Sequence, residues 1–225
     1  MKTYFRTLVL RAWRHSCIVV LLISGSAAGD IIPILQTRTL HTGAGVSSPG
    51  GGSSDSDDAE AVDFGPFVRS IQSSAAFGGA SASGSASQNS SITVSGFSAI
   101  GSAGGGASGG NDFAQPGGSG RSTFILEFDL TAPGNVSGTF ARQTSGISFA
   151  NAGMTISGVG SFSSSPVSVD LPGGHYTITI EASASAASMN FESASASATF
   201  NIQLVPEPSS FLLLVGVVGL LRMRR

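Results

Sequence analysis

An alternation of apolar and polar residues is the main pattern in the middle of this chain. In residues 124–130 every second residue is a bulky apolar one, from Phe124 to Leu130, while Glu127 and Asp129 lie between them. A period of two is typical of an antiparallel strand with one buried and one solvated face. The Pro133-Gly134 pair then predicts a turn, and we expect residues 136–141 to form the return strand.

Several other segments show the same period. In residues 176–182 and 193–204 we expect an inward row of apolar residues, which changes from alanine to Phe200, Ile202 and Leu204 along the second segment. Residues 81–87, 92–95, 154–157 and 167–171 are shorter candidate strands, and Gly or Pro turns separate them. The pattern predicts an all-β fold, an antiparallel, jelly-roll-like β-sandwich over residues 64–204. Alanine on the inward face lets sheets approach more closely than bulky residues do, but buries less apolar area.

Two regions rich in glycine and serine are expected to lie outside the strands. Residues 29–63 are interpreted as a flexible acidic leader, and residues 101–120 as a glycine-rich loop. The acidic run 55–60 could chelate calcium, because alternating carboxylates suit hard cations. It lacks a full calcium-loop pattern, so we favour a solvated linker.

The first 28 residues have the three parts of a secretory signal peptide. Four basic residues precede the apolar run 17–23, and small residues lead to an expected cleavage site after Ala28. An N-terminal membrane anchor is the alternative. It is disfavoured because about 7 apolar residues cannot span a hydrocarbon core that needs roughly 20.

The last 21 residues, 205–225, form a second tripartite segment. Pro206-Glu207-Pro208 comes first, an apolar run reaches Leu221, and a basic cluster ends the chain: Arg222, Arg224 and Arg225. The arginines are expected to stay cytoplasmic and stop translocation. That orientation places the preceding chain outside the cytoplasm, in agreement with the N-terminal signal.

This tail resembles the PEP-CTERM sorting domain of Gram-negative bacteria. The resemblance rests on Pro206, Glu207 and Pro208, on the apolar run, and on the arginine cluster. It implies recognition by an exosortase, removal of the tail, and a destination at the cell surface or in an extracellular matrix. It also implies a host that makes extracellular polysaccharide.

The apolar run differs from a permanent membrane anchor in its length. Residues 209–221 are 13 in number, or about 20 Å of helix, against a hydrocarbon core of about 30 Å. A short C-terminal hydrophobic helix that enters the membrane transiently fits this length better than a lasting span. An uncleaved anchor is the alternative.

Charge and composition exclude several classes of function. The region between the two signals contains four arginines and twelve carboxylates, which gives it a net charge of −8. Such a chain offers few cations for nucleic acid or anionic lipid. Cys17 lies in the signal, and no lysine lies beyond it, so we expect no disulfide, thiol or lysine chemistry.

Candidate catalytic residues are few. His41 and His175 are each isolated in the sequence, His41 in the expected leader and His175 after a Gly-Gly turn. Paired carboxylates can hydrolyse glycosides, but the carboxylates on predicted strands are more simply surface charges: Glu127, Asp129, Glu181 and Glu192. We therefore expect no catalytic residue, cofactor or metal.

The sequence predicts an exported structural or interaction protein and not an enzyme. The expected partners are the general secretion machinery, an exosortase and extracellular polysaccharide, after a transient stay in the inner membrane. Nucleic acid is not an expected partner. The alternatives are a secreted carbohydrate-binding module, for which the mature chain offers only Tyr176 beyond phenylalanine as a stacking aromatic, and an uncleaved membrane-anchored ectodomain.

Overall fold

In the part of the chain that the structure describes, the regular structure consists of β-strands. The computed structural model describes residues 29–61, 63–109, 113–189 and 193–206. In chain order the strands are β1 (Ile31–Ser48), β2 (Gly51–Ala61), β3 (Phe67–Phe77), β4 (Ala80–Thr93), β5 (Gly96–Ser108), β6 (Gln115–Leu130), β7 (Gly134–Ser145), β8 (Ser148–Ile156), β9 (Gly160–Phe162), β10 (Val167–Leu171), β11 (Gly174–Ala187) and β12 (Ser193–Pro206). The prediction of an all-β fold is confirmed.

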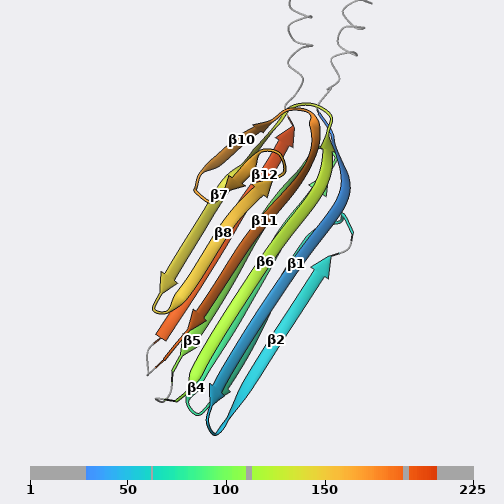
Figure 1. Ribbon diagram of the computed structural model, residues 1–225. Coiled ribbons are helices and arrows are strands. Elements are labelled where there is room, and N and C mark those ends of the chain that lie inside the picture. The colour runs from blue at the N-terminus through green and yellow to red at the C-terminus, as the bar shows by residue number, and fades with distance from the viewer. Residues whose placement is uncertain (1–28, 62, 110–112, 190–192, 207–225) are drawn as a thin grey trace, which may run out of the picture.

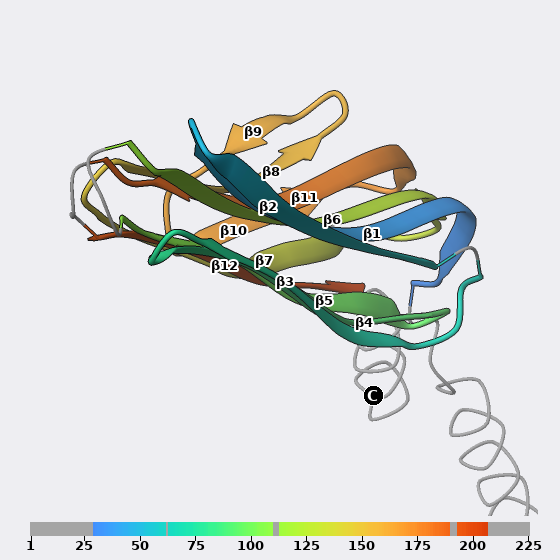
Figure 2. The same cartoon turned by 90° about the horizontal axis from the view of Figure 1, so that it is seen from below.

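The strands form two antiparallel six-stranded sheets that pack face to face (Figures 1 and 2). Sheet 1 has the order β2-β1-β6-β11-β8-β9, and sheet 2 has the order β10-β7-β12-β5-β4-β3. This arrangement confirms the predicted antiparallel β-sandwich. From β5 onward the pairs are nested, because β5 pairs with β12, β6 with β11, β7 with β10 and β8 with β9.

The turn after Leu130 does not make the expected hairpin. The strand at 124–130 and the strand that follows were both predicted correctly, but β6 lies in sheet 1 and β7 lies in sheet 2. The chain therefore crosses between the layers there. A Pro-Gly turn fixes local direction, whereas the choice between a hairpin and a crossing depends on which strands compete for each edge.

The segment 29–63 is not a flexible leader, and this part of the sequence-based prediction is wrong. It contributes β1 and β2, and β1 pairs with β6 along almost its whole length. Its inward positions are buried, including Leu40, Thr42 and Val46. High serine and glycine content lowers strand propensity, but pairing on both sides of β1 compensates for it.

The expected loop at 101–120 is also wrong, because most of it belongs to β5 and β6. Gly118 and Gly120 face the other sheet, and a Cβ at either position would overlap a carbonyl oxygen of β4, that of Ser83 or Ser85. The glycines therefore allow a close approach of two backbones instead of marking a loop.

Bulky and small residues occupy different ends of the same core. One end, the bulky half, is built around the inward side chains of residues 124–130 of β6, 176–180 of β11 and 200–204 of β12. The phenyl rings of Phe97 and Phe124 lie 5.3 Å apart there, and the rings of Phe128 and Tyr176 lie 5.9 Å apart. The other end, the small-residue half, holds alanine and glycine at residues 117–120, 182–186 and 194–198.

Candidate functional site

The predicted sorting motif begins where the described chain ends. Pro206 is the last residue of β12 and pairs with Gly134 of β7. The rest of the motif and the arginine cluster, namely Glu207, Pro208, Arg222, Arg224 and Arg225, lie outside the described residues. The predicted signal peptide, residues 1–28, lies outside them as well.

The first and last described residues lie at the same end of the sandwich (Figure 1). The backbone N–H of Asp30 donates to Thr131 Oγ1 at 2.8 Å, and the N–H of Thr131 donates to the Asp30 carbonyl at 3.0 Å. Thr131 is three residues before Gly134, the partner of Pro206. Both ends of the described chain are therefore held against the link between β6 and β7.

The carboxylates on predicted strands lie on the outer face of sheet 1. His175 lies between two of them, with Nδ1 2.9 Å from Asp129 Oδ1 and Nε2 3.4 Å from Glu127 Oε1. Arg121 donates to Glu181 Oε2 at 2.6 Å, and Glu192 lies outside the described residues. This grouping is an exposed charge network of the kind that contributes little to stability.

His175 is isolated in the sequence but not in space. Its neighbours come from β6 through the pairing of Gly174 with Leu130, a register that no local sequence signal reveals. His41 likewise lies on β1 and not in a leader, with Nδ1 2.6 Å from Asp58 Oδ1 on β2.

The acidic run 55–60 lies on β2, at the edge of sheet 1. Asp55 accepts a hydrogen bond of 2.9 Å from the backbone N–H of Ser74 on β3, which joins the edges of the two sheets. In the ranges that the structure describes, no three side chains of histidine, cysteine or acidic type are arranged to hold a metal ion. The run is an edge strand whose charges oppose pairing with another chain.

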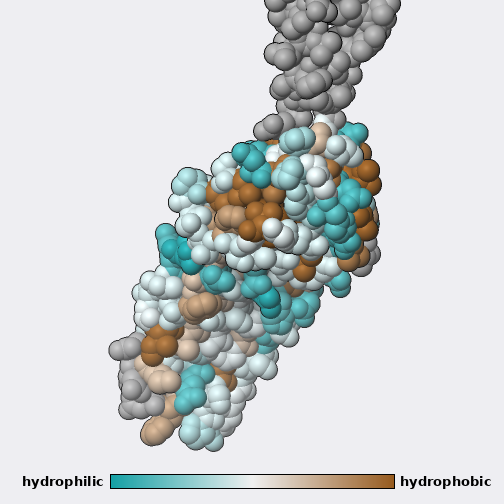
Figure 3. All heavy atoms as spheres, turned by 45° about the horizontal axis from the view of Figure 1, so that its top comes forward, coloured by the Kyte–Doolittle hydropathy of each residue, from teal (hydrophilic) through white to brown (hydrophobic). Residues whose placement is uncertain are grey.

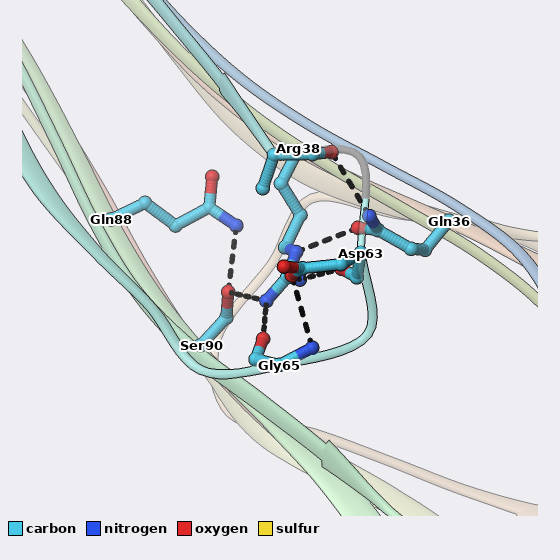
Figure 4. Close-up of polar contacts among 7 residues, drawn as sticks. Gln36, Arg38, Asp63, Gly65, Gln88 and Ser90 are labelled. Atoms are coloured by element: carbon cyan, nitrogen blue, oxygen red, sulfur yellow. Dashed lines mark hydrogen bonds and ion pairs between the residues drawn. The ribbon is translucent and has the colours of Figure 1, made fainter.

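Arg38 is a fully buried cation that sequence reasoning missed (Figure 4). Its Nε donates to Gln36 Oε1 at 2.6 Å, and Nη1 donates to the Gly65 carbonyl at 2.7 Å. Nη2 donates to the carbonyl oxygen of Asp63 and lies 3.7 Å from the Asp63 carboxylate. The Phe67 ring lies beneath the guanidinium, with its centroid 5.5 Å from Cζ.

These contacts fix the link between β2 and β3, which crosses from sheet 1 to sheet 2. Burial lowers the pKa of Arg38, and the Asp63 carboxylate opposes that shift, so the group remains a cation. A buried cation needs partners that replace its water, and the carbonyls of the crossing supply them. A sequence signal for this site does exist. The region between the two predicted signals has four arginines, and Arg38 is at an inward position of a segment with alternating burial.

Two surface hollows lie near these groups. The larger, about 360 Å³, lies between the end of β2 and the start of β3 and includes Glu60, Asp63 and Arg69. The smaller, about 280 Å³, lies over β8, β9 and β11 and includes Thr155, Thr179 and Glu181. The larger hollow places two carboxylates and a guanidinium where they can form hydrogen bonds with a polar ligand.

Comparisons with known proteins give no relative from which a role could be transferred. No model of a protein family matches the chain, no curated protein matches it, and no solved structure matches it. Within the described ranges, no helix is long and apolar enough to cross a membrane. A function can therefore be inferred only from this chain's own residues.

Proposed function

We propose that this chain is an exported surface or extracellular-matrix protein whose C-terminal segment is a sorting signal for an exosortase. The observation that carries the proposal is the position of the two ends. β1 starts at Ile31, shortly after the expected signal cleavage site, and Pro206, the first residue of the Pro-Glu-Pro motif, pairs with Gly134 at the same end of the sandwich. A sorting enzyme in the membrane would therefore meet the motif at one end of the sandwich, next to the strand that precedes it.

The proposed role of the sandwich is structural and not catalytic. Its nested strand pairs support a jelly-roll-like class. The strands from β5 to β12 pair as they would if one long hairpin were folded over on itself. The carboxylates of Glu127, Asp129 and Glu181 lie on an open sheet face and are paired with His175 or Arg121. Such a rigid, acidic, cysteine-free module is suited to a matrix or surface layer.

A carbohydrate-binding module is the second candidate, and the larger hollow favours it. Glu60, Asp63 and Arg69 could form hydrogen bonds with the hydroxyl groups of a polysaccharide. Against it, Tyr176 is buried in the core, while Tyr4 and Trp13 lie in the predicted signal. Retention of the protein on the host's extracellular polysaccharide, compared with a neutral polysaccharide, would distinguish a binding module from a structural one.

The proposed sorting can be tested in the native host. Wild type is compared with a variant in which Pro206, Glu207 and Pro208 are each replaced by alanine. We expect wild type outside the cell, with an intact mass that lacks the residues beyond the motif, and the variant at full length in the inner membrane. A control of the same size replaces Ser163, Ser164 and Ser165, which lie between β9 and β10, by alanine and should be processed like wild type.

A different result would separate the alternatives. If wild type and variant both remain in the membrane with Arg225 intact, the tail is a lasting anchor and the sorting proposal is wrong. If both are found outside the cell with the tail removed at the same site, the Pro-Glu-Pro motif does not direct the cleavage.

A further inference from the structure

Exposed apolar side chains gather at the end of the sandwich where the described chain begins and ends. Five residues form this apolar end, with exposed fractions of 47 to 67%: Ile32, Ile34, Leu35, Val94 and Val205. Figure 3 shows hydrophobic areas on the end that comes forward in that view, with hydrophilic residues between them. Exposed apolar side chains that gather at one end of a soluble domain can mark an interaction site.

The five residues are held together by the ladder and turns at that end. The N–H of Ile31 donates to the carbonyl of Val94 at 2.8 Å, so the β4–β5 turn lies against the start of β1. Val205 pairs with Asn135, just after the link that Asp30 contacts through Thr131. The apolar end is therefore made from three separate parts of the chain, with Ile32 on sheet 1 and Val205 on sheet 2.

The sequence beyond Pro206 limits how far this end can lie from a membrane. Four residues, 207–210, separate Pro206 from the apolar run that begins at Phe211. Five residue steps reach about 17 Å when fully extended. If the apolar run enters a bilayer, Pro206, which follows Val205 of the apolar end, must lie within that distance of the run's first residue.

The short length of the run favours an even closer approach. Its 13 residues make about 20 Å of helix, less than a hydrocarbon core of about 30 Å. A domain that rests in the head-group layer lets the run start deeper than a domain held away in water. Apolar side chains at the base of the domain lower the cost of that position because they leave water for the interface.

We propose that the apolar end rests on the lipid surface while the C-terminal run is in the bilayer. In this arrangement Ile32, Leu35 and Val94 lie in the head-group layer, and the small-residue half points away from the membrane. The inference depends on the proposed membrane insertion of the tail and adds the orientation of the domain. Removal of the tail would leave only this shallow contact, so the protein would then leave the membrane.

Acidic groups beside the apolar end predict which lipids it favours. Ile32 pairs with Asp129 and Leu35 pairs with Glu127, and Asp30 lies just before β1. These carboxylates repel the negative surface of anionic lipid. The apolar end should therefore approach zwitterionic lipid more closely than anionic lipid.

The orientation can be measured with a depth-dependent fluorescent label. Cys17→Ser removes the chain's one cysteine, and single labels are then placed at Val94→Cys, at Phe149→Cys and at Val217→Cys in the full chain. The chain is reconstituted in phosphatidylcholine vesicles that contain a lipid brominated near the head group. Val94 and Phe149 are matched because both are apolar and similarly exposed, at 67% and 62%, and Phe149 lies in the small-residue half.

We expect quenching of the labels at positions 217 and 94, and at least about twofold less quenching at position 149, because interfacial burial extends only about 5–10 Å. Replacement of the zwitterionic lipid by phosphatidylglycerol should reduce quenching at 94 and leave quenching at 217 unchanged. If 217 is quenched and 94 behaves like 149, the orientation is wrong while the tail insertion stands. If 217 is not quenched, the tail is not in the bilayer and the proposed function itself is overturned.

Discussion

The bulky half and the small-residue half are built from the same strands, yet they hold the two sheets together in different ways. The inward positions of β6 change from Gly118 and Gly120 through Ser122 to Phe124 and Phe128. β11 and β12 change at the same level, from alanine to isoleucine and from alanine to phenylalanine. In one half side chains fill the space between the sheets, and in the other half the backbones themselves approach.

The difference shows that the size of the residue at each inward position sets the local distance between the two sheets. Sheets packed through ordinary side chains lie about 10 Å apart. In the small-residue half a Cβ on Gly105 would lie 2.5 Å from the carbonyl oxygen of Gly118, which belongs to the other sheet. Large side chains stabilise the bulky half through buried apolar area, whereas the small-residue half depends on close contact between atoms of two backbones.

The largest effect is expected in the bulky half. Phe128→Ala should lower the free energy of unfolding by about 3–5 kcal/mol, because it removes a fully buried ring and leaves a cavity. Ala184→Gly, a truncation of a buried residue in the small-residue half, should cost only about 1 kcal/mol. Urea unfolding of the sandwich domain measures both losses.

Equal losses from these two substitutions would contradict the division of the core. A larger loss for Ala184→Gly would mean that the small-residue half is the principal source of stability. Ala152→Gly, also buried and inward, lies on β8 opposite Ala182 and serves as a second control for the loss of a methyl group.

An intermediate effect is expected from the addition of a single methyl group to the small-residue half. Gly118→Ala should cost about 1–3 kcal/mol, because the new Cβ would overlap backbone atoms of β4 that cannot rotate away. Its neighbour provides the matched control, since a Cβ on Gly117 would meet only the carbonyl of Ala186, at 3.8 Å. Gly117→Ala should therefore leave the free energy of unfolding nearly unchanged.

The comparison of these two variants by urea unfolding tests the close approach of the sheets directly. If Gly118→Ala is as stable as Gly117→Ala, the backbones of β6 and β4 are not in contact. The small-residue half would then be more loosely packed than the structure shows. A loss for both variants of similar size would instead point to strand propensity as the cause.

Sequence reasoning succeeded where bulky residues alternate with polar ones. The strand at 124–130 and its inward row, together with those at 176–182 and 193–204, could be predicted because their period of two is strong. It failed at residues 29–63 and 101–120 because glycine and serine normally indicate loops. That rule assumes ordinary sheet spacing, and β1, β5 and β6 use small residues for the opposite purpose.

The candidate site could be predicted only in part for a related reason. The Pro-Glu-Pro sequence of the proposed sorting motif can be read directly from the sequence, but the position of Pro206 beside the first described residues depends on the register of β7 and β12. The partners of His175 and Arg38 come from strands far away in the chain. Pairing between strands that are far apart in the chain depends on which strand edges are already paired. It cannot be predicted from the residues near a given position.

The smallest effect is expected at Ser122, where the inward row of β6 changes from glycine to phenylalanine. Its hydroxyl is buried and has no hydrogen-bond partner among the described residues, and it points toward Gly101 of the other sheet. Ser122→Ala should change the free energy of unfolding by less than about 0.5 kcal/mol, or raise it slightly, because a buried polar group without a partner carries an uncompensated desolvation cost.

Ser90→Ala is the matched substitution, since the hydroxyl of Ser90 accepts from Gln88 at 3.2 Å and from Arg38 at 3.4 Å. It should cost about 1 kcal/mol in the same urea titration. A loss at Ser122 equal to the loss at Ser90 would show that the hydroxyl at the boundary is hydrogen-bonded, and that the change from side-chain packing to backbone packing includes a polar contact.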